Sequence, residues 1–437
     1  MNQKEFRRRR QRFLKTLGPG TVAILTTSSV CYRNRDTEYP FRPDSDFYYL
    51  TGFPEPEAVL VMIPGRPEGE TLLFCRERNA EKEMWTGARA GIEGAKEVYG
   101  IDEAHSIAQL DEIMPSLLEN RYRIYYTLGL NPTLDARVVG WIGQVRRKTR
   151  IGIRAPSEIV DLERVLHEQR LFKATAELKR MRTAARISTC AHRRAMQICR
   201  PGMREYQLEA ELLHEFTRAG ARSPAYASIV AAGGNACVLH YSDNNGEIHD
   251  GDLVLIDAGC EVEYYASDIT RTFPANGRFS EAQRQLYDLV LKAQRAAIDE
   301  VRPGRRWNDP HDTAVRVLTK GLVALGLLDG KVKDLIKEEN YKRFYMHRTG
   351  HWLGMDVHDV GEYKVNGEWR ELKPGMVLTI EPGIYIPREA EGIPKEYWGI
   401  GIRIEDDCLV TEAEAEVLTA AVPTDPEEIE SLMAKHQ

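Results

Sequence analysis

The pattern of hydrophobic and polar positions divides this chain into two stretches. Between residues 21 and 154, short apolar runs alternate with segments of helical periodicity, which is typical of an α/β domain built on a buried sheet. The apolar runs are TVAIL (21–25), AVLVMI (58–63), ETLLFC (70–75), RIYYTLG (123–129) and RIGIR (150–154). From about Pro156 onward the pattern becomes helical, with charged side chains on one face. We therefore predict an α/β domain over residues 1–170 and a second domain over 171–437.

The second domain combines predicted helices with pairs of short strands. The helical segments cover roughly residues 156–199, 205–219, 281–301 and 312–325. Two strands share one template, because GDLVLIDAG (251–259) and GMVLTIEPG (375–383) both read as Gly, four mostly apolar residues, Ile, an acid, any residue and Gly. A further strand with an acid follows each, SDITRTF (267–273) and GIRIEDD (401–407). This repeat predicts an α+β domain of two related halves whose sheets face each other and deliver carboxylates to the interface.

Acids and one histidine stand at the ends of these apolar runs or within short polar inserts. They are Asp257, Asp268, His351, Glu381 and Glu405. A carboxylate at the end of a buried strand is costly unless it is paired or bound to a metal. Four carboxylates with one imidazole form a hard, oxygen-dominated donor set, which suits Mn²⁺, with Co²⁺ or Zn²⁺ as alternatives. Because so many negative charges require more than one cation, we predict a two-metal site and metal-assisted hydrolysis.

The first two acids can be placed relative to each other by strand pairing. If the chain folds back around residues 262–263, Asp257 and Asp268 become direct cross-strand neighbours on one face of the sheet. Val262 and Glu263 are unfavourable residues for a two-residue turn, so we expect a longer loop or a bulge there. Thr270 and Thr272 share the face of Asp268, where their hydroxyls can orient its carboxylate.

Arg403 is a candidate for orienting the carboxylates or a substrate. Ile402 and Ile404 alternate with Arg403 and Glu405, so the two charged residues point away from the side on which the isoleucines pack. We therefore expect the Arg403 guanidinium to lie on the same side of the sheet as the acids.

The segment HRTGHWLGMDVHDVG (347–361) supplies three histidines in twelve positions. His347 and His351 have the spacing of a zinc-peptidase helix, but Arg348 stands where that motif needs its catalytic glutamate, which excludes that chemistry. We interpret His351 as a metal ligand. The other two histidines, together with His240 at the end of another strand, are candidates for handling protons.

Composition excludes several other classes of protein. Hydrophobic residues make up 42% of the chain and charged residues 29%, and no segment approaches the roughly 18 apolar residues of a membrane span. A net charge of -6 gives no electrostatic footprint for nucleic acid. We expect the basic cluster at residues 7–10 to be the solvated side of an N-terminal helix. Seven cysteines without a CxxC pair argue against a disulfide framework or a cysteine zinc site, and a cytoplasmic location fits best.

Several motifs together resemble one peptidase family, which includes aminopeptidase P, prolidase, methionine aminopeptidase and creatinase and has the pita-bread fold. The resemblance covers nearly the whole chain and is closest to bacterial members of the aminopeptidase P type. It rests on EYPFRPDSDFYYLTGFPEPEAVLV (38–61), RLFK (170–173), CRPGM (199–203), DGDLVLIDAGCE (250–261), DITRTFP (268–274), HWLGMDVHDVG (351–361), PGMVLTIEPGIYI (374–386) and GIGIRIEDD (399–407). It implies a C-terminal pita-bread catalytic domain with pseudo-twofold halves, preceded by a creatinase-type α/β domain.

The resemblance also implies roles for individual residues. The five dinuclear ligands are Asp257, Asp268, His351, Glu381 and Glu405, with Asp268 and Glu405 bridging the ions. Histidines that hold substrate and stabilise the tetrahedral intermediate are His240, His347 and His358, and Tyr226 and Tyr385 match positions near the site. Trp85 is similar to a tryptophan that a neighbouring subunit places over the site. One departure is that Arg348 and Thr349 replace small residues, which affects local substrate contacts.

The implied activity is hydrolysis of the first peptide bond of substrates whose second residue is proline. In this reaction Glu381 also relays a proton to the leaving nitrogen. The N-terminal domain is expected to build a homo-oligomer, a dimer or tetramer, and to restrict access to the site. Prolidase, which cleaves Xaa-Pro dipeptides, is the nearest alternative. Methionine aminopeptidase usually lacks so large an N-terminal partner, creatinase would lack the metal ligands, and a binding module without catalysis should lack ligands and carry charged tails.

Overall fold

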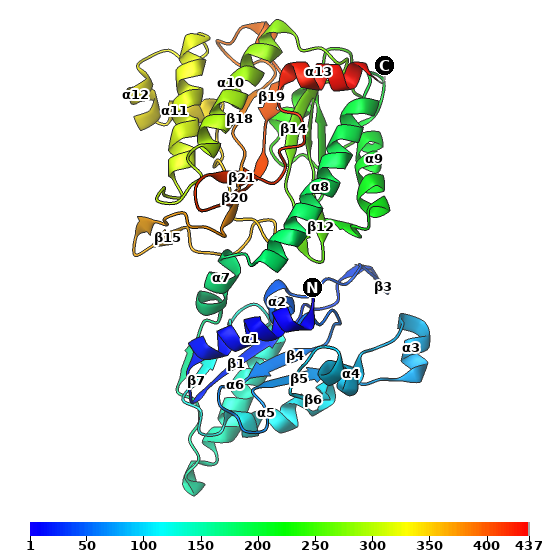
Figure 1. The fold of residues 1–437 in the computed structure, drawn as a ribbon, viewed down its shortest axis with the longest axis vertical. Helices are drawn as coiled ribbons and strands as arrows, with labels where there is room; N and C mark the ends of the chain where they lie inside the picture. The colour runs from blue at the N-terminus through cyan, green and yellow to red at the C-terminus, as the bar shows by residue number, and fades with distance from the viewer. Residues whose placement is uncertain (436–437) are drawn as a thin grey trace. The chain divides into compact units, whose positions relative to one another are not determined.

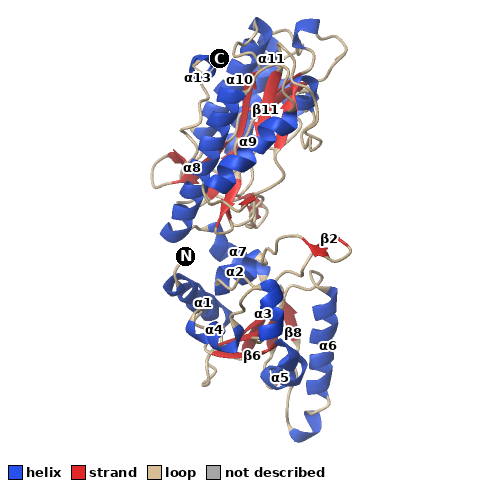
Figure 2. Cartoon of the chain, turned by 90° about the vertical axis from the view of Figure 1, so that its right-hand side faces the viewer, coloured by secondary structure: helices blue, strands red, loops and turns tan. Residues whose placement is uncertain are grey.

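The computed structural model describes residues 1–435, which form two compact units, Met1–Gln169 and a second that begins at Arg170 (Figures 1 and 2). Within residues 1–435, no helix is both long and apolar enough to cross a membrane. All seven cysteines are free thiols.

The first unit is built on a six-stranded mixed sheet in the order β6-β5-β4-β1-β7-β8. Its strands are β1 (Thr21–Thr26), β4 (Val59–Met62), β5 (Thr71–Cys75), β6 (Glu103–Ser106), β7 (Arg123–Tyr125) and β8 (Glu158–Val160), and β2 (Tyr32–Asn34) and β3 (Thr37–Glu38) form a separate hairpin. Its helices are α1 (Gln3–Leu17), α2 (Ser45–Thr51), α3 (Ala80–Thr86), α4 (Gly91–Glu97), α5 (Leu110–Leu118), α6 (Pro132–Arg146) and α7 (Glu163–Leu171), the last of which runs into the second unit. The central strands are buried on both faces, which explains their continuous apolar runs.

One face of this sheet packs against α5 and α6. Alternate residues of β1, Val22 and Ile24, join Leu110 of α5 and Trp141 of α6 in one hydrophobic core. The predicted strand RIGIR was wrong, because this segment forms a 3-10 turn over Thr149–Ile151 followed by irregular chain. Its apolar side chain Ile151 is 76% exposed and therefore has no sheet face to pack on.

The basic cluster of α1 is solvated only in part: Arg7 and Arg8 are exposed as predicted, but Arg9 and Arg10 are not. Arg9 and Arg10 are both buried. The Arg9 guanidinium donates to the carbonyl oxygen of Tyr49 at 3.1 Å, and that of Arg10 donates to those of Leu50 at 2.9 Å and Gly100 at 2.7 Å. The carbonyls of Tyr49 and Leu50 belong to the last turn of α2, where the helix itself supplies no N–H donors. The two arginines supply these donors instead.

Two pairs of long helices flank the strands of the second unit, with α8 and α9 on one side and α10 and α11 on the other (Figure 1). The helices are α8 (Thr175–Ile198), α9 (Glu205–Arg218), α10 (Glu281–Ile298), α11 (Asp309–Ala324), α12 (Val332–Lys337) and α13 (Pro426–Ala434). Helix α10 begins at a capping box in which Ser280 and Gln283 each accept the other's backbone N–H. The predicted helical segments 205–219, 281–301 and 312–325 are present as α9, α10 and α11, with ends shifted by up to three residues. The predicted segment 156–199 differs, because it begins with the strand β8 and is divided into α7 and α8.

The strands of the second unit form several small antiparallel sheets. They are β9 (Ser223–Pro224), β10 (Ile229–Ala232), β11 (Leu253–Asp257), β12 (Cys260–Val262), β13 (Tyr265–Ala266), β14 (Thr270–Pro274), β15 (Lys364–Val365), β16 (Glu368–Trp369), β17 (Val377–Ile380), β18 (Gly383–Ile386), β19 (Ile400–Arg403), β20 (Asp406–Val410) and β21 (Ala415–Val417). The first half pairs β10-β11-β14, and the second pairs β17-β20-β21 and β18-β19. The halves meet where the N–H of Glu405 donates to the carbonyl of Thr270 at 3.1 Å. Thr270 pairs with the last residue of β11, and Asp406, next to Glu405, pairs with the last residue of β17. The repeated segments β11 and β17 therefore end near one interface.

The hairpin that carries the first two acids differs from its predicted register. Asp257 lies opposite Thr270, and the turn consists of two residues, Glu263 and Tyr264, both with positive φ. The pairing is therefore shifted by two residues, and the turn is short although neither residue is glycine. A shift of two keeps Asp268 on the predicted side, because side chains alternate with a period of two.

Candidate active site

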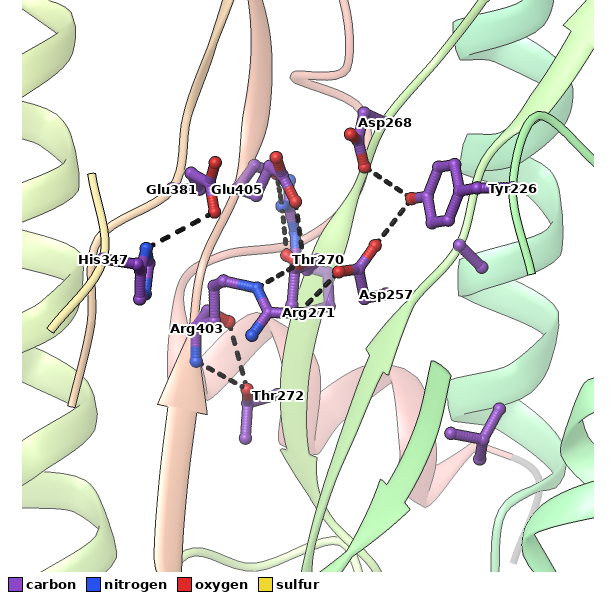
Figure 3. A network of polar contacts seen from close by, with 12 residues as sticks. Tyr226, Asp257, Asp268, Thr270, Arg271, Thr272, His347, Glu381, Arg403 and Glu405 are labelled. Atoms are coloured by element: carbon purple, nitrogen blue, oxygen red, sulfur yellow. Dashed lines mark hydrogen bonds and ion pairs between the residues drawn. The ribbon is translucent and has the colours of Figure 1, made fainter. Parts of the chain in front are cut away.

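The acids converge from the ends of four strands (Figure 3). Asp257 is the last residue of β11, and Asp268 stands just before β14. Glu381 directly follows β17, and Glu405 lies between β19 and β20. Each strand is buried up to its acid, so the backbone fixes where the carboxylate emerges.

His351 lies beside three of these carboxylates, those of Asp268, Glu381 and Glu405. One donor atom each from Asp268, His351 and Glu405 lies within 4.8 Å of the other two, a spacing that can hold a metal ion. The Nε2 atom of His351 is 3.4 Å from Asp268 Oδ2 and 3.9 Å from Glu381 Oε1. The structure thus gathers the histidine and three of the acids that the sequence analysis named as ligands.

Tyr226 and Arg403 connect the fourth acid to this group. The Tyr226 hydroxyl lies 2.6 Å from Asp257 Oδ1 and 2.5 Å from Asp268 Oδ1, so it shares its proton between the two carboxylates (Figure 3). Arg403 donates to Asp257 Oδ2 at 2.5 Å and to the hydroxyl of Tyr385 at 3.1 Å. The predicted position of Arg403 beside the acids is therefore observed, and its partner is Asp257.

Burial and mutual repulsion make the charged form of this cluster costly. Burial, with the charges of neighbouring carboxylates, raises the pKa of Glu405 well above its usual range and that of Glu381 to about 7. Burial also raises the pKa of Asp257, although Arg403 opposes this. Burial acts on Asp268 too, but hydrogen bonds from His351 and Tyr226 outweigh it and lower the pKa of that carboxyl. Divalent cations fit such a donor set, because they offset the repulsion between buried carboxylates.

The hydrogen bonds of His351 fix which nitrogen faces the acids. Its Nδ1 lies 3.0 Å from the carbonyl of Trp352, which can only accept, so Nδ1 carries a proton and donates. Burial alone would lower the pKa of His351, but the Asp268 carboxylate raises it to about 9. The Nε2 atom is therefore aimed at the carboxylates, and a bound cation would take the place of its proton.

His347 has a different environment. Burial and the charge of Arg403 lower the pKa of His347 to about 3, so its imidazole is neutral. Its Nδ1 donates to the carbonyl of Arg348 at 2.7 Å, which leaves Nε2 to accept from the Tyr385 hydroxyl at 2.8 Å. The Nδ1 atom is also 3.7 Å from Glu381 Oε2. His347 and Tyr385 thus form a neutral hydrogen-bonded pair beside the acids.

The other two candidate histidines are solvent-exposed. The ring of His358 meets that of His351 edge to face, with centroids 4.4 Å apart. Burial and the neighbouring His351 lower the pKa of His358. His240 is near enough to both His347 and His358 for its charge to lower their pKa values. The exposed imidazole of His358, next to His351, is available to contact a substrate.

The two threonines of β14 have different partners from those predicted. The Thr270 hydroxyl donates to Glu405 Oε2 at 2.7 Å and accepts from Arg403 Nε at 3.1 Å. The Thr272 hydroxyl donates to the carbonyl of Arg403 at 3.0 Å. Neither bonds to Asp268, because both hydroxyls are bound by residues of the second half of the unit.

Sequence reasoning missed two supports of the ligands. Asp407 is buried, and both its carboxylate oxygens lie 3.2 Å from the backbone nitrogen of Asp268. Burial and the nearby Asp268 raise the pKa of Asp407 well above its usual range. Thr349 is buried and hydrogen-bonded to Tyr345 at 2.5 Å and to His311 at 2.8 Å. Asp407 stands within the quoted segment GIRIEDD, and its position in a buried strand was the available signal.

The departure at residues 348 and 349 has a structural explanation. The hydroxyl of Thr349 is hydrogen-bonded to Tyr345 and His311, and its carbonyl accepts the N–H of Glu381 at 2.8 Å. Arg348 hydrogen-bonds to Asn308 and lies over the ring of Trp369, 5.3 Å from its centroid. These contacts hold the segment between His347 and His351.

Trp85 belongs to the first unit. It lies on α3 with 83% of its surface exposed, next to the equally exposed Met84. Both side chains are accessible in the single chain.

Two family models match this chain. The model for metallopeptidase family M24 matches residues 179–412, and the model for the aminopeptidase P N-terminal domain matches residues 6–125. The first match covers more than half of the chain and contains all the acids and histidines described above. The chain belongs to metallopeptidase family M24.

Curated relatives of this M24 peptidase match it along its full length. Xaa-Pro aminopeptidase of Escherichia coli (strain K12) is 46% identical over 434 residues, covering 99% of this chain and 98% of that protein. Xaa-Pro aminopeptidase of Haemophilus influenzae is 44% identical over 431 residues, covering 99% and 97%.

Solved structures agree with these matches. The structure of a Pseudomonas aeruginosa aminopeptidase is 57% identical, with a TM-score of 0.99 over 100% of this chain and 99% of that one. A zinc-substituted E. coli aminopeptidase P in complex with product gives a TM-score of 0.97 at 46% identity, with the same coverage. The predicted fold is confirmed: a pita-bread M24 domain of two halves follows an α/β N-terminal domain.

Proposed function

We propose that this M24 peptidase is an Xaa-Pro aminopeptidase, which releases the first residue of peptides whose second residue is proline, at a dinuclear metal centre. The observation that carries the proposal is the convergence of four carboxylates with Nε2 of His351 at the strand ends, in a chain that matches Xaa-Pro aminopeptidases along its full length. Asp257, Asp268, Glu381 and Glu405 complete the ligand set with that histidine. Mn²⁺ is the preferred ion for this oxygen-rich set, with Co²⁺ or Zn²⁺ as substitutes.

When bound, a pair of divalent ions supplies Lewis-acid activation of water and of the peptide carbonyl. The chain's own groups orient the ligands and move protons. Arg403 and Tyr226 hold Asp257 in place, and Thr270 holds Glu405. Glu381 would be both a metal ligand and the carboxylate that relays a proton to the departing prolyl nitrogen.

The histidines bind substrate around this centre. His358 donates to the developing oxyanion, and His240 and the neutral pair of His347 and Tyr385 line the position of the scissile bond. The tertiary amide before proline has no N–H, so the site needs no acceptor for one.

Metal content and a cleavage assay test this proposal together. We expect two equivalents of metal by elemental analysis, loss of Xaa-Pro-Yaa hydrolysis on chelation, and strongest recovery with Mn²⁺. Xaa-Pro dipeptides serve as the discriminating substrate, because exclusive cleavage of dipeptides would identify a prolidase instead. Full activity after complete removal of metal would contradict the dinuclear centre.

We also propose that the protein acts in the cytoplasm as a homo-oligomer, a dimer or tetramer. The N-terminal unit, residues 1–169, would form the contacts, and the exposed Trp85 would cover the site of a neighbouring subunit. Seven free thiols are compatible with a reducing compartment. Sedimentation of wild type and Trp85→Ala, with KM for a long Xaa-Pro peptide, tests this arrangement. An unchanged KM in an intact oligomer would remove the role of Trp85.

A further inference from the structure

The carboxylate of Glu205, the first residue of α9, is fully buried and receives four hydrogen bonds. Its Oε1 accepts from the N–H of Ala232 at 2.8 Å and from the side-chain amide of Asn235 at 2.9 Å. Its Oε2 accepts from the hydroxyl of Tyr241 at 2.8 Å and from the N–H of Gly246 at 2.7 Å. The carboxylate also stands in the first turn of a helix, where the helix dipole favours negative charge. Glu205 is therefore well satisfied as a buried anion.

Two of these partners, Tyr241 and Gly246, belong to one irregular segment, residues 238–246, and the other two directly precede it. The segment follows the 3-10 turn η3 (Gly233–Cys237) and contains no helix or strand. Tyr241 and Gly246 are both tied to Glu205, and the backbone N–H of Glu205 donates in turn to the carbonyl of Gly246 at 3.0 Å. A segment without a backbone ladder depends on such side-chain contacts for a single conformation.

A second anchor lies between these two. Asn244 is buried, accepts the N–H of Val230 at 3.0 Å and donates to the carbonyl of Ser228 at 2.8 Å. It attaches the middle of the segment to the beginning of β10. His240, which directly precedes Tyr241, is the exposed histidine whose charge reaches His347 and His358.

We propose that Glu205 is a positioning residue for His240: it fixes the neighbouring Tyr241 and the end of the segment at Gly246, and so sets where the His240 imidazole stands beside the substrate. The inference rests on the proposed peptidase function, because it assigns Glu205 to the substrate-binding histidine. It also accounts for the segment CRPGM (199–203), since Gly202 and Met203 pair with Ile248 and bring Glu205 against the end of the loop.

The donor set requires a carboxylate in particular. All four partners donate, and a carboxylate offers acceptors only. In glutamine an NH₂ group would replace one carboxylate oxygen, so two of the partners would face a donor and lose their hydrogen bonds. Gly246 is matched to Glu205, because a Cβ at that position would lie 2.9 Å from both carboxylate oxygens. Replacing Glu205 with Gln therefore keeps the side-chain volume and disrupts two of the four hydrogen bonds.

A double-mutant cycle with His240→Ala tests the proposal. We expect Glu205→Gln to lower kcat/KM on an Xaa-Pro-Yaa peptide about 10-fold in wild type and less than about 2-fold in the His240→Ala background. Tyr241→Phe, which removes one hydroxyl, should follow the same pattern with a smaller effect. Glu215→Gln is the matched control: it lies on the same helix, its carboxylate is also buried, and its charged partners, Arg218 on α9 and Arg194 on α8, lie outside residues 238–246. Equal losses from Glu205→Gln in both backgrounds would overturn the proposal.

Hydrogen exchange gives a second measurement that does not depend on activity. Glu205→Gln and Tyr241→Phe should each speed amide exchange in residues 238–246, and Glu215→Gln should leave it unchanged. Unchanged exchange in both anchor variants would overturn the positioning role. If the wild type cleaved no Xaa-Pro-Yaa peptide, the peptidase assignment would fail, while exchange would still report on the anchor.

Discussion

The guanidinium of Arg403 lies 2.5 Å from the carboxylate of Asp257, although 146 residues separate the two in sequence. Both side chains are largely shielded from solvent, with 5% and 13% exposed, so water screens their attraction little. The pair joins the two halves of the M24 domain, because Asp257 ends β11 and Arg403 ends β19. One contact thus links the repeat of the fold to the geometry of the site.

Loss of this contact should impair catalysis. We expect Arg403→Ala to lower kcat/KM on Xaa-Pro-Yaa peptides about 100-fold, because Asp257 and Tyr385 both lose their guanidinium donor. Arg403→Lys should recover only part of the loss, since an ammonium cannot reproduce the planar fork. Kinetics and metal content of both variants measure the effect. Near-normal turnover of Arg403→Ala would show that Asp257 is oriented without it.

The proposed bridging ligands should be the most sensitive positions. Asp268→Ala and Glu405→Ala should each remove bound metal and lower kcat at least about 100-fold, because one carboxylate serves both ions. Glu263→Ala is the control, since it removes a carboxylate from the same hairpin at its half-exposed turn. Elemental analysis of each purified variant checks the cause. A variant that retained two ions and normal turnover would contradict the bridging role.

The pH dependence of folding should reveal His192. This histidine is fully buried on α8, its Nε2 donates to the carbonyl of Ala258 at 2.8 Å, and burial lowers its pKa from 6.5 to about 4. Between these values the unfolded chain binds a proton that the folded chain does not, so stability falls as pH falls through this window. The shift corresponds to on the order of 3 kcal/mol.

Urea unfolding with chelator present measures this contribution. The wild type should lose stability relative to His192→Gln between about pH 6.5 and pH 4, because glutamine donates to the same carbonyl and does not titrate. Other titrations, including that of His311, cancel in the difference. A difference that did not vary with pH would contradict the assignment.

The sequence predicted the residue types and places of the site better than its local geometry. Acids at the ends of apolar runs can be recognised from the sequence alone, because a carboxylate at the end of a buried strand needs a partner or a bound cation to offset its charge. The partners of Thr270 and Thr272 were predicted wrongly, since they lie in the second half of the unit, more than 130 residues away in sequence. The hairpin register was predicted two residues off, since it depends on two non-glycine turn residues with positive φ. Propensities do not favour such a turn, and the surrounding pairing imposes it.

Other features required the tertiary structure. Arg9 and Arg10 follow a basic run that is typical of a solvated helix face, yet they cap carbonyls of another helix. The support that Asp407 gives to the backbone of Asp268 joins segments 139 residues apart and leaves no periodic signal. Contacts of this kind are decided by packing between distant elements.

A buried ion pair next to Glu405 should be costly to break from one side. Arg271 is fully buried and donates to Asp406 at 2.7 Å, to the carbonyl of Glu405 at 2.6 Å and to that of Thr270 at 2.9 Å. Arg271→Met would leave the Asp406 carboxylate buried with its charge unpaired. We expect a loss of about 3–5 kcal/mol in the free energy of unfolding.

The exposed pair of Arg284 and Asp288 on α10 provides the comparison for this change. Their side chains are 35% and 50% exposed, and the second partner of Arg284, Glu427 at 2.6 Å, is 69% exposed, so Arg284→Met should cost less than about 1 kcal/mol. Removing both partners, with Arg271→Met and Asp406→Leu, should be less damaging than Arg271→Met alone, because no unpaired charge remains. Urea unfolding of the metal-free variants measures all three. If Arg271→Met cost no more than Arg284→Met, the buried pair would be dispensable, and packing alone would hold the backbone of Glu405 in place.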